Sequence, residues 1–268
     1  MQDTSFEQQF ENILIKENMD LVKHKIMIMS NKGGVGKSTI AANIADELSN
    51  QGFQVGLLDI DIHGPSQAKI FNLNNQKLKM NEKNKIIPFQ PKENLKIVTI
   101  AGMLDDENQS VIWRGPLKIN MIKQFIMNVL WNDLDYLIID APPGTGDEPL
   151  TISQIINLDG MIIVTTPQDL ALVDSKKAIT FARKLNIKIL GVIENMSFFY
   201  CSNCNQKIDL FKYNNKQSSF KKMGINILGS LPFDPKLLEC MDEGSLFMKN
   251  YNQTIVGKMI KNIVSEII

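Results

Sequence analysis

The sequence lacks the features of a secreted or membrane-spanning protein. It has three cysteines in 268 residues, too few and odd in number for the disulfide framework of a secreted domain. No apolar run reaches the roughly 18 residues that cross a bilayer. The opening stretch, MQDTSFEQQFENILIKENMD, contains neither an apolar signal core nor an arginine-rich pattern. These absences predict a cytoplasmic protein.

Charge of one sign is not in excess either. Lys plus Arg and Asp plus Glu each total 29, so the formal net charge is zero. A protein that binds a nucleic-acid backbone through charge usually carries a basic excess. The composition therefore argues against a nucleic-acid partner.

Seven short apolar runs, rich in β-branched residues, recur along the chain. They are KIMIMS, FQVGLLDID, LKIVTIA, DYLIIDAP, DGMIIVTTP, IKILGVIEN and INILGSLPF. Such runs without polar alternation are typical of strands covered on both faces, and hence of a parallel sheet. Helical patterns such as KSTIAANIADELSNQG separate most of them. The sequence predicts an α/β fold with a doubly wound, mostly parallel sheet flanked by helices.

We predict a single domain over residues 24–268, preceded by an N-terminal helical extension over residues 1–23. No linker rich in Gly, Ser or Pro divides the chain. The polar segment 72–94 is expected to form a loop or a small hairpin at the edge of the sheet, and the segment 197–211 is expected to be a cysteine-containing insertion.

A glycine-rich turn joins a predicted strand to a predicted helix in KIMIMSNKGGVGKSTIAANIA. It fits the end of the phosphate-loop pattern G-x-x-x-x-G-K-[ST], although Asn31 stands at the position of the first glycine. In such a loop the backbone N–H groups face phosphate oxygens, with the positive end of a helix behind them. The predicted nucleotide-binding residues are Gly33, Gly34, Val35, Gly36, Lys37, Ser38 and Thr39.

Three side chains of this loop have predicted roles. Lys37 would hold the terminal phosphates as a point charge, and the Ser38 hydroxyl would bind Mg²⁺. Lys32 is a second lysine on the same loop. It would be either solvated or directed to a phosphate held by a partner subunit.

Two predicted strands end in carboxylates near the nucleotide. In LLDIDIHGPS, alternation along the strand would place Asp59 and Asp61 on one face. In YLIIDAPPGTGD, four apolar residues precede Asp140, an arrangement in which the acid holds Mg²⁺ directly or through water. We predict Asp59 and Asp140 for the magnesium shell and Asp61 for orienting the attacking water. A helix cap is the alternative role for Asp61.

Cys201 and Cys204 form a C-x-x-C pair in FFYCSNCNQK. A closed thiolate site needs four ligands, and the sequence has no second such pair and no nearby His pair. By itself the pair can supply only half of a metal site, for which zinc and an iron–sulfur cluster are both suitable. Redox-active thiols are a further alternative. Cys240 is expected to be a buried structural thiol.

Six motifs occur in the order and approximate spacing of one family. They are KGGVGKST, DIDIHGPS, VIWRGP, DYLIIDAPPGTGD, VTTPQDLALVDSKKAI and GVIENMSFFYCSNC, and the match as a whole extends from about residue 24 to about residue 244. Together they resemble the Mrp/ApbC-type iron–sulfur cluster carrier ATPases of the deviant Walker A, P-loop class, which includes the nitrogenase iron protein and MinD. The segment DLFKYNNKQSSFKKMG departs from the pattern, because the family often has a Gly-rich stretch there.

The resemblance implies a homodimer in which Cys201 and Cys204 of both subunits bind one bridging [4Fe-4S] cluster. It implies ATP and Mg²⁺ as further cofactors, and transfer of the cluster to recipient apoproteins, with cluster scaffold proteins as other partners. A cluster held only at an interface can be released when nucleotide changes that interface.

The resemblance also implies roles for individual residues. Lys32 would cross the dimer interface to the neighbour's nucleotide and would be catalytic together with Lys37 and Asp61. Asn195, in IEN, would pair with the adenine edge, and Pro232, in LPFDP, would border the same pocket.

Two other functions stay open. A zinc-bridged dimeric ATPase would use the same two half-sites. A MinD-like membrane-positioning ATPase would bind lipid through a C-terminal amphipathic helix, and NQTIVGKMIKNIVSEII has an apolar helical face. That tail has few positive charges and no aromatic anchors, so we expect a helix docked on the core and no stable membrane association.

Overall fold

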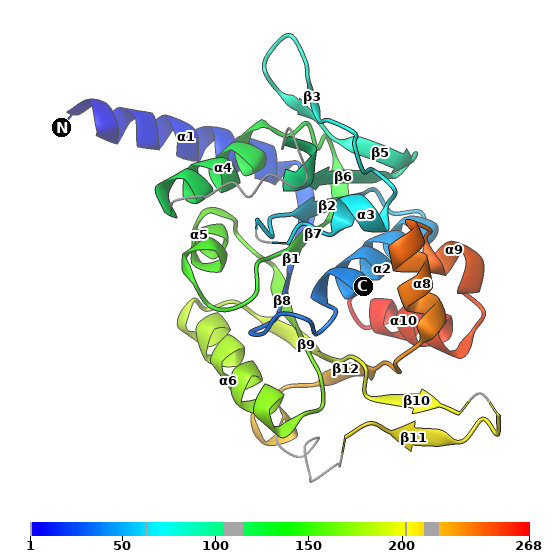
Figure 1. Ribbon diagram of the computed structural model, residues 1–268. Helices are drawn as coiled ribbons and strands as arrows, with labels where there is room; N and C mark the ends of the chain where they lie inside the picture. The colour runs from blue at the N-terminus through cyan, green and yellow to red at the C-terminus, as the bar shows by residue number, and fades with distance from the viewer. Residues whose placement is uncertain (1, 63, 104–114, 202, 212–219) are drawn as a thin grey trace.

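The computed structural model describes residues 2–62, 64–103, 115–201, 203–211 and 220–268. Its centre is an eight-stranded sheet with the order β12-β9-β8-β1-β7-β2-β6-β5 (Figure 1). The strands are β1 Val22–Met29, β2 Val55–Asp59, β5 Phe89–Lys92, β6 Leu95–Thr99, β7 Leu134–Asp140, β8 Gly160–Thr165, β9 Ile189–Glu194 and β12 Ile227–Ser230. Only β5 runs antiparallel to its neighbour. The seven predicted runs form the seven parallel strands, which confirms the predicted fold class.

Helices cover both faces of this sheet (Figure 1). One layer contains α2 Lys37–Asn50, α8 Pro235–Glu243, α9 Phe247–Tyr251 and α10 Ile255–Ser265. The other contains α1 Gln2–Asp20, α4 Gly115–Asn128, α5 Asp147–Ile155 and α6 Asp169–Lys184. The short α3 Gln67–Ile70 and the 3-10 helix η1 Ile100–Met103 follow β2 and β6. The helices of each layer pack against their own side of the sheet, so the described residues form two hydrophobic cores.

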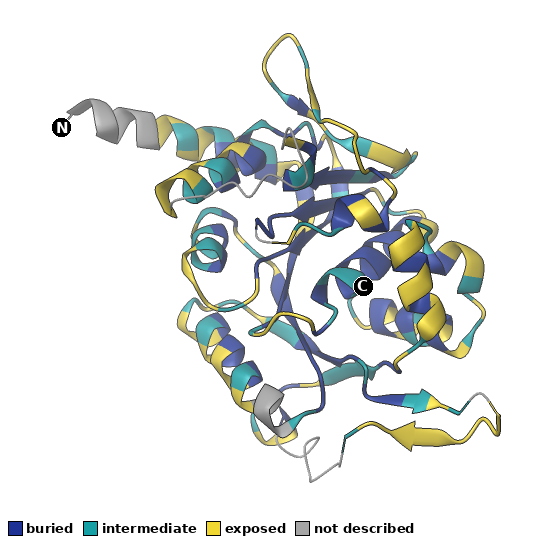
Figure 2. Ribbon diagram, in the orientation of Figure 1, coloured by how far each residue is buried: buried dark blue, intermediate teal, exposed yellow. Residues whose placement is uncertain are grey.

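The central strand β1 shows why the apolar runs lack polar alternation. Ile26 and Ile28 face the core that contains α2, while Met27 and Met29 face the core that contains α4 and α6. All four are buried, and the middle of the sheet is dark throughout in Figure 2. Because both faces of the strand are covered, every position favours an apolar side chain.

Helix α1 is tied to the second core. Ile15 and Met19 are buried there, and Asn18 Nδ2 donates hydrogen bonds to the carbonyl oxygens of Ile126 (2.7 Å) and Val129 (3.0 Å). The next element, β1, starts at Val22, so the predicted boundary at residue 24 falls inside a strand. The C-terminal half of the predicted extension is therefore part of the packed domain.

In the described part of the chain, two small hairpins lie outside the main sheet. Strands β3 Lys79–Met80 and β4 Ile86–Ile87 pair antiparallel, so of the predicted loop or hairpin within residues 72–94 the hairpin is the form found. The edge strand β5 in the same segment was not predicted. Strands β10 Phe198–Tyr200 and β11 Lys207–Asp209 form the second hairpin, which carries the cysteine pair. Figure 2 shows that this second hairpin projects from the body and that β11 is exposed.

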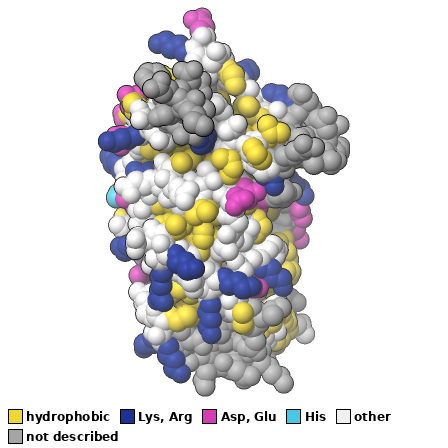
Figure 3. Space-filling view, turned by 90° about the vertical axis from the view of Figure 1, so that its left-hand side faces the viewer, with side chains coloured by type: hydrophobic (Ala, Val, Ile, Leu, Met, Phe, Trp, Pro, Cys, Tyr) yellow, Lys and Arg dark blue, Asp and Glu magenta, His cyan; other side chains and the backbone are white. Residues whose placement is uncertain are grey.

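The side of the molecule on which α6 lies has many basic side chains. In Figure 3, Lys and Arg gather over its lower half. Helix α6 presents Lys176, Lys177, Arg183 and Lys184 to solvent. Although the formal net charge of the chain is zero, this part of its surface is rich in positive charges.

The terminal helix α10 is docked on the core, as predicted. Its apolar face, Val256, Ile260, Ile263 and Val264, is buried. This face packs against α2 and β12. Within the described ranges, no helix is long and apolar enough to cross a bilayer.

Replacing Ile263 by Asp is expected to destabilise the protein by about 3 kcal/mol or more, because it buries an unpaired charge. Urea unfolding would measure this loss. Asn262→Asp is the matched control, since Asn262 is exposed and receives the same side chain. If Ile263→Asp unfolded like the wild type but no longer bound anionic vesicles, the helix would serve a membrane and not the core.

Candidate active site

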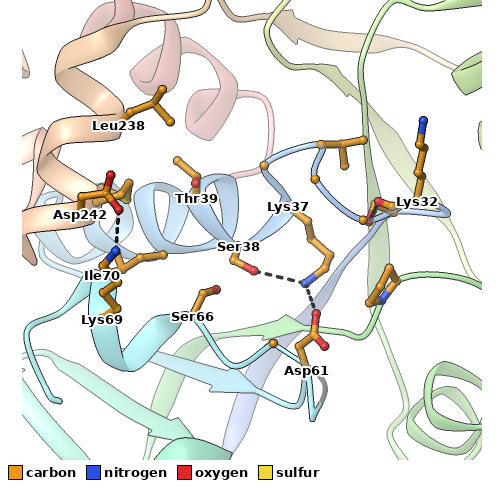
Figure 4. A pocket seen from close by; sticks show the side chains of 18 residues that line it. Lys32, Lys37, Ser38, Thr39, Asp61, Ser66, Lys69, Ile70, Leu238 and Asp242 are labelled. Atoms are coloured by element: carbon orange, nitrogen blue, oxygen red, sulfur yellow. Dashed lines mark hydrogen bonds and ion pairs between the residues drawn. The ribbon is translucent and has the colours of Figure 1, made fainter. Parts of the chain in front are cut away.

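A pocket of about 450 Å³ opens above the glycine-rich loop between β1 and α2 (Figure 4). Its walls come from the loop itself, from the turn between β2 and α3, and from α8. The lining residues are Ser30, Lys32, Gly33, Gly34, Val35, Gly36, Lys37, Ser38, Thr39, Asp61, Gly64, Ser66, Lys69, Ile70, Pro143, Leu238, Met241 and Asp242. The structure thus brings together the whole predicted phosphate loop and Asp61.

Gly36 gives the loop its shape immediately before α2. Its φ of 81° is left-handed, a conformation that side chains other than glycine rarely adopt. Asn195, at the end of β9, donates a hydrogen bond from Nδ2 to the carbonyl oxygen of Val35 (2.9 Å). A Cβ on Gly36 would lie 2.2 Å from that nitrogen. The loop therefore requires glycine at residue 36.

Gly36→Ala is expected to lower nucleotide affinity by at least about tenfold, because the loop must leave its left-handed turn and lose the Asn195 contact. Titration with a fluorescent ADP analogue measures this. Gly115→Ala is the control, since a Cβ there meets nothing within 4 Å. Unchanged affinity in a folded Gly36→Ala protein would contradict the requirement for glycine.

Lys37 is the cation at the floor of the pocket. It is 6% exposed, its Nζ forms an ion pair with Asp140 Oδ1, and it lies 3.5 Å from Asp61 Oδ2. Figure 4 shows it between Ser38 and Asp61. Burial by itself would lower the pKa of Lys37, but Asp140, Asp61 and Asp59 outweigh that effect and raise it. Lys37 is therefore charged and ready to meet phosphate.

Asp59 lies beneath this lysine and is fully buried. It accepts hydrogen bonds from Thr99 Oγ1 (2.9 Å) and from the backbone N–H groups of Asp61 (3.1 Å) and Gln67 (3.2 Å). Burial, with a further contribution from the neighbouring Asp140, raises the pKa of Asp59 to about 7. The two carboxylates are neighbours because residues 59 and 140 are paired across β2 and β7.

The expectation that Asp59 and Asp61 lie on one face of the same strand is wrong for Asp61. Strand β2 ends at Asp59, so Asp61 belongs to the following turn and not to the same strand. The backbone N–H of Asp61 donates to Asp59 Oδ1, which holds this turn against the strand end. The turn, and not strand periodicity, places the Asp61 carboxylate beside Lys37.

The oxygen atoms at this point fit magnesium. Ser38, Asp59 and Asp140 supply the hard oxygen donors that Mg²⁺ prefers. Ser66 Oγ and Gln67 Oε1 are also buried there and have no hydrogen-bond partner within the described chain. Sequence reasoning missed both residues, although they directly follow the GP of the motif DIDIHGPS.

Lys32 differs from Lys37. It is exposed on the rim of the pocket, and in Figure 4 its side chain points away from Lys37. Its ammonium makes no hydrogen bond or ion pair with any part of the chain that the structure describes. Its predicted reach to a partner subunit stays a prediction.

Neither of the two predicted base-binding residues is among the side chains that line this pocket, although Asn195 contacts its loop. The Asn195 amide is engaged with the loop carbonyl of Val35. Pro232 lines a second cavity, of about 610 Å³, together with Tyr200, Ile255 and residues of α8. Binding of the base by either residue therefore stays a prediction.

The cysteine pair lies in the turn of the β10–β11 hairpin. The N–H of Cys201 donates to Gln206 O (2.9 Å), and the N–H of Asn205 donates back to Cys201 O (2.8 Å). Backbone N–H groups of Asn203 and Cys204 lower the pKa of the Cys201 thiol, and the Cys204 side chain adds to this. The turn therefore favours a thiolate, the form that binds metal.

The two thiols of this hairpin differ in exposure from each other and from the third cysteine. Cys201 is half-buried and Cys204 is exposed, whereas Cys240 is buried in α8 as predicted. Within residues whose placement is described, no group of three or more His, Cys, Asp or Glu side chains is arranged to hold a metal. The missing ligands would have to come from elsewhere.

Comparison with known proteins shows the family of the chain. A family model described as NUBPL iron-transfer P-loop NTPase (ParA) matches residues 21–268. The chain belongs to this family. An iron–sulfur cluster carrier protein from Methanocaldococcus jannaschii is 47% identical over 231 residues, which are 86% of this chain and 79% of that relative.

Solved structures show the same fold. A nucleotide-binding protein from Archaeoglobus fulgidus in complex with ADP is 35% identical, with a TM-score of 0.79 over 91% of this chain and 96% of that one. The cell division ATPase MinD from Pyrococcus furiosus is 22% identical, with a TM-score of 0.67 over 91% of this chain and 98% of that one. The second likeness concerns the fold alone.

Proposed function

We propose that the protein is an ATPase that binds a [4Fe-4S] cluster between two copies of itself and transfers it to apoproteins. The observation that carries this proposal is a pair of thiols, one half-buried and one exposed, on the same chain as a phosphate loop. A closed site would need two further ligands. A cluster takes four cysteine ligands, and a two-fold axis supplies two from each copy. The similar carrier protein from M. jannaschii supports iron–sulfur cargo.

The nucleotide site would work through charge and position. Backbone N–H groups of residues 33–39 receive the phosphates, and Lys37 exchanges its carboxylate partners for phosphate oxygens. Ser38, Asp59 and Asp140 would hold Mg²⁺, which neutralises developing phosphate charge when bound. Asp61, at the pocket wall, would orient the attacking water.

The second copy would complete both sites. Lys32 is exposed on the rim of the pocket, and it would reach the nucleotide of a facing subunit. Nucleotide binding would then favour one arrangement of the two chains over another. Because the cluster is held between those chains, the same change would loosen or strengthen its ligation. Recipient apoproteins and scaffold proteins would bind at the β10–β11 hairpin, which carries the cysteine pair.

Anaerobic reconstitution with iron and sulfide tests the proposal. The expected result is broad visible absorbance, an iron content of one [4Fe-4S] cluster per two chains, and a native mass of a dimer. ATP hydrolysis is measured on the same sample. A colourless protein that retains zinc would contradict the iron–sulfur cargo and favour the zinc-bridged dimer. A monomer that binds a cluster would contradict a cluster site shared between two chains.

A further inference from the structure

Gln67 contacts Asp59 and Asp140, two of the three residues that are proposed to hold magnesium. It is the first residue of α3 and is 0% exposed. Its Nε2 donates to Asp140 Oδ2 (2.8 Å) and to the carbonyl oxygen of Ser38 (3.0 Å), and its backbone N–H donates to Asp59 Oδ2 (3.2 Å). Through its side chain and its backbone N–H, Gln67 thus joins the start of α3 to the ends of β2 and β7 and to the start of α2.

The two oxygens of Asp140 have partners of different kinds. Oδ1 is paired with the Lys37 ammonium, which phosphates would attract away. Oδ2 is held by the Gln67 amide, which is neutral and has a second acceptor on the phosphate-loop helix. The orientation of Asp140 therefore depends on Gln67 even after Lys37 has left.

The other end of the same amide has no partner. Gln67 Oε1 is buried and accepts no hydrogen bond from the described part of the chain, and the neighbouring Ser66 Oγ is buried and unpartnered in the same way. A buried polar atom without a partner is unfavourable and needs an explanation. Mg²⁺ usually keeps several waters when it binds to protein, and those waters are donors.

We propose that Gln67 is a positioning residue of the magnesium site. Its Nε2 fixes Asp140, and its Oε1 offers an acceptor to the hydration shell of the ion. The inference rests on the proposed ATPase function, because the ion arrives with the nucleotide. The role is one that a neutral amide can fill and a carboxylate cannot, since a third carboxylate beside Asp59 and Asp140 would repel them.

The test compares ADP affinity in Mg²⁺ with ADP affinity in EDTA, by calorimetry on the full chain. Gln67→Leu removes both ends of the amide at similar size. It is expected to keep the EDTA affinity within about threefold and to lose about tenfold or more of the affinity that Mg²⁺ adds in the wild type, as for other residues that orient metal ligands. Gln51→Leu is the control, because Gln51 is exposed after the far end of α2.

Gln67→Glu serves as the second variant if Gln67→Leu does not fold. It keeps an oxygen at Oε1 but removes the donor to Asp140, and it is expected to lose the Mg²⁺ effect as well. Equal loss of affinity with and without Mg²⁺ would overturn the proposal, because Gln67 would then only support the loop. A full Mg²⁺ effect in both variants would overturn it too. If the wild type bound no ADP in Mg²⁺ or in EDTA, that result would instead contradict the proposed ATPase function.

Discussion

Replacing Lys37 by alanine is expected to reduce ATP turnover by about 100-fold or more and to destabilise the nucleotide-free protein. The loss of turnover follows from removing a preorganised cation from phosphoryl transfer. The loss of stability follows from the ion pairs with Asp140 and Asp61. Removing one partner of a buried pair leaves an uncompensated charge and costs about 3–5 kcal/mol.

ATP hydrolysis and urea unfolding measure the two effects separately. Lys37→Arg retains the charge and should recover most of the stability, but not the turnover, because a guanidinium does not replace the ammonium point charge. Cluster reconstitution of Lys37→Ala should be at least partly retained, since the hairpin is a separate element. A folded variant that loses both hydrolysis and the cluster would contradict this division of roles.

Lys32→Ala provides the contrast on the same loop. Lys32 is exposed, so its removal should change the free energy of unfolding by no more than about 0.5 kcal/mol. If Lys32 reaches the partner's nucleotide, the rate of ATP hydrolysis falls in Lys32→Ala while the free energy of unfolding is unchanged. If Lys37→Ala proved as stable as Lys32→Ala, Lys37 would not be the counterion of the buried carboxylates in solution.

Changing Cys201 and Cys204 together to serine is expected to abolish cluster binding and leave the fold intact. The two thiols are half of the proposed ligand set, and serine cannot replace thiolate toward iron–sulfur clusters with comparable strength. Stability should change little, because β11 and the turn that carries Cys204 are exposed. Visible absorbance and iron content measure the cluster, and urea unfolding measures the stability.

Cys240→Ala is the matched control for this double variant. Cys240 is 4% exposed and belongs to the hydrophobic core to which α2 also contributes. Its replacement should keep the full cluster content and lower stability by about 1 kcal/mol, through the small cavity it leaves. A cluster that persisted in the double serine variant, or that disappeared in Cys240→Ala, would place the ligands elsewhere.

The sequence by itself determined the layered fold and the chemical character of the site. The seven apolar runs predict the parallel strands because burial on both faces of a strand requires apolar residues at consecutive positions. The phosphate loop and the C-x-x-C pair are contiguous, so the residue types and their spacing specify them directly. For the same reason the hairpin within residues 72–94 and the docked terminal helix were predictable.

Only the tertiary structure decided which distant residues meet. The pairing of residues 59 and 140 across β2 and β7 places two carboxylates side by side, and the strand order that causes it cannot be read from either segment. The same holds for Asn195 against Val35, which are 160 residues apart, and for Gln67 against Asp140, which are 73 residues apart. Local sequence specifies periodicity and turns, whereas strand order and register set long-range contacts, and at this site those contacts orient the functional groups.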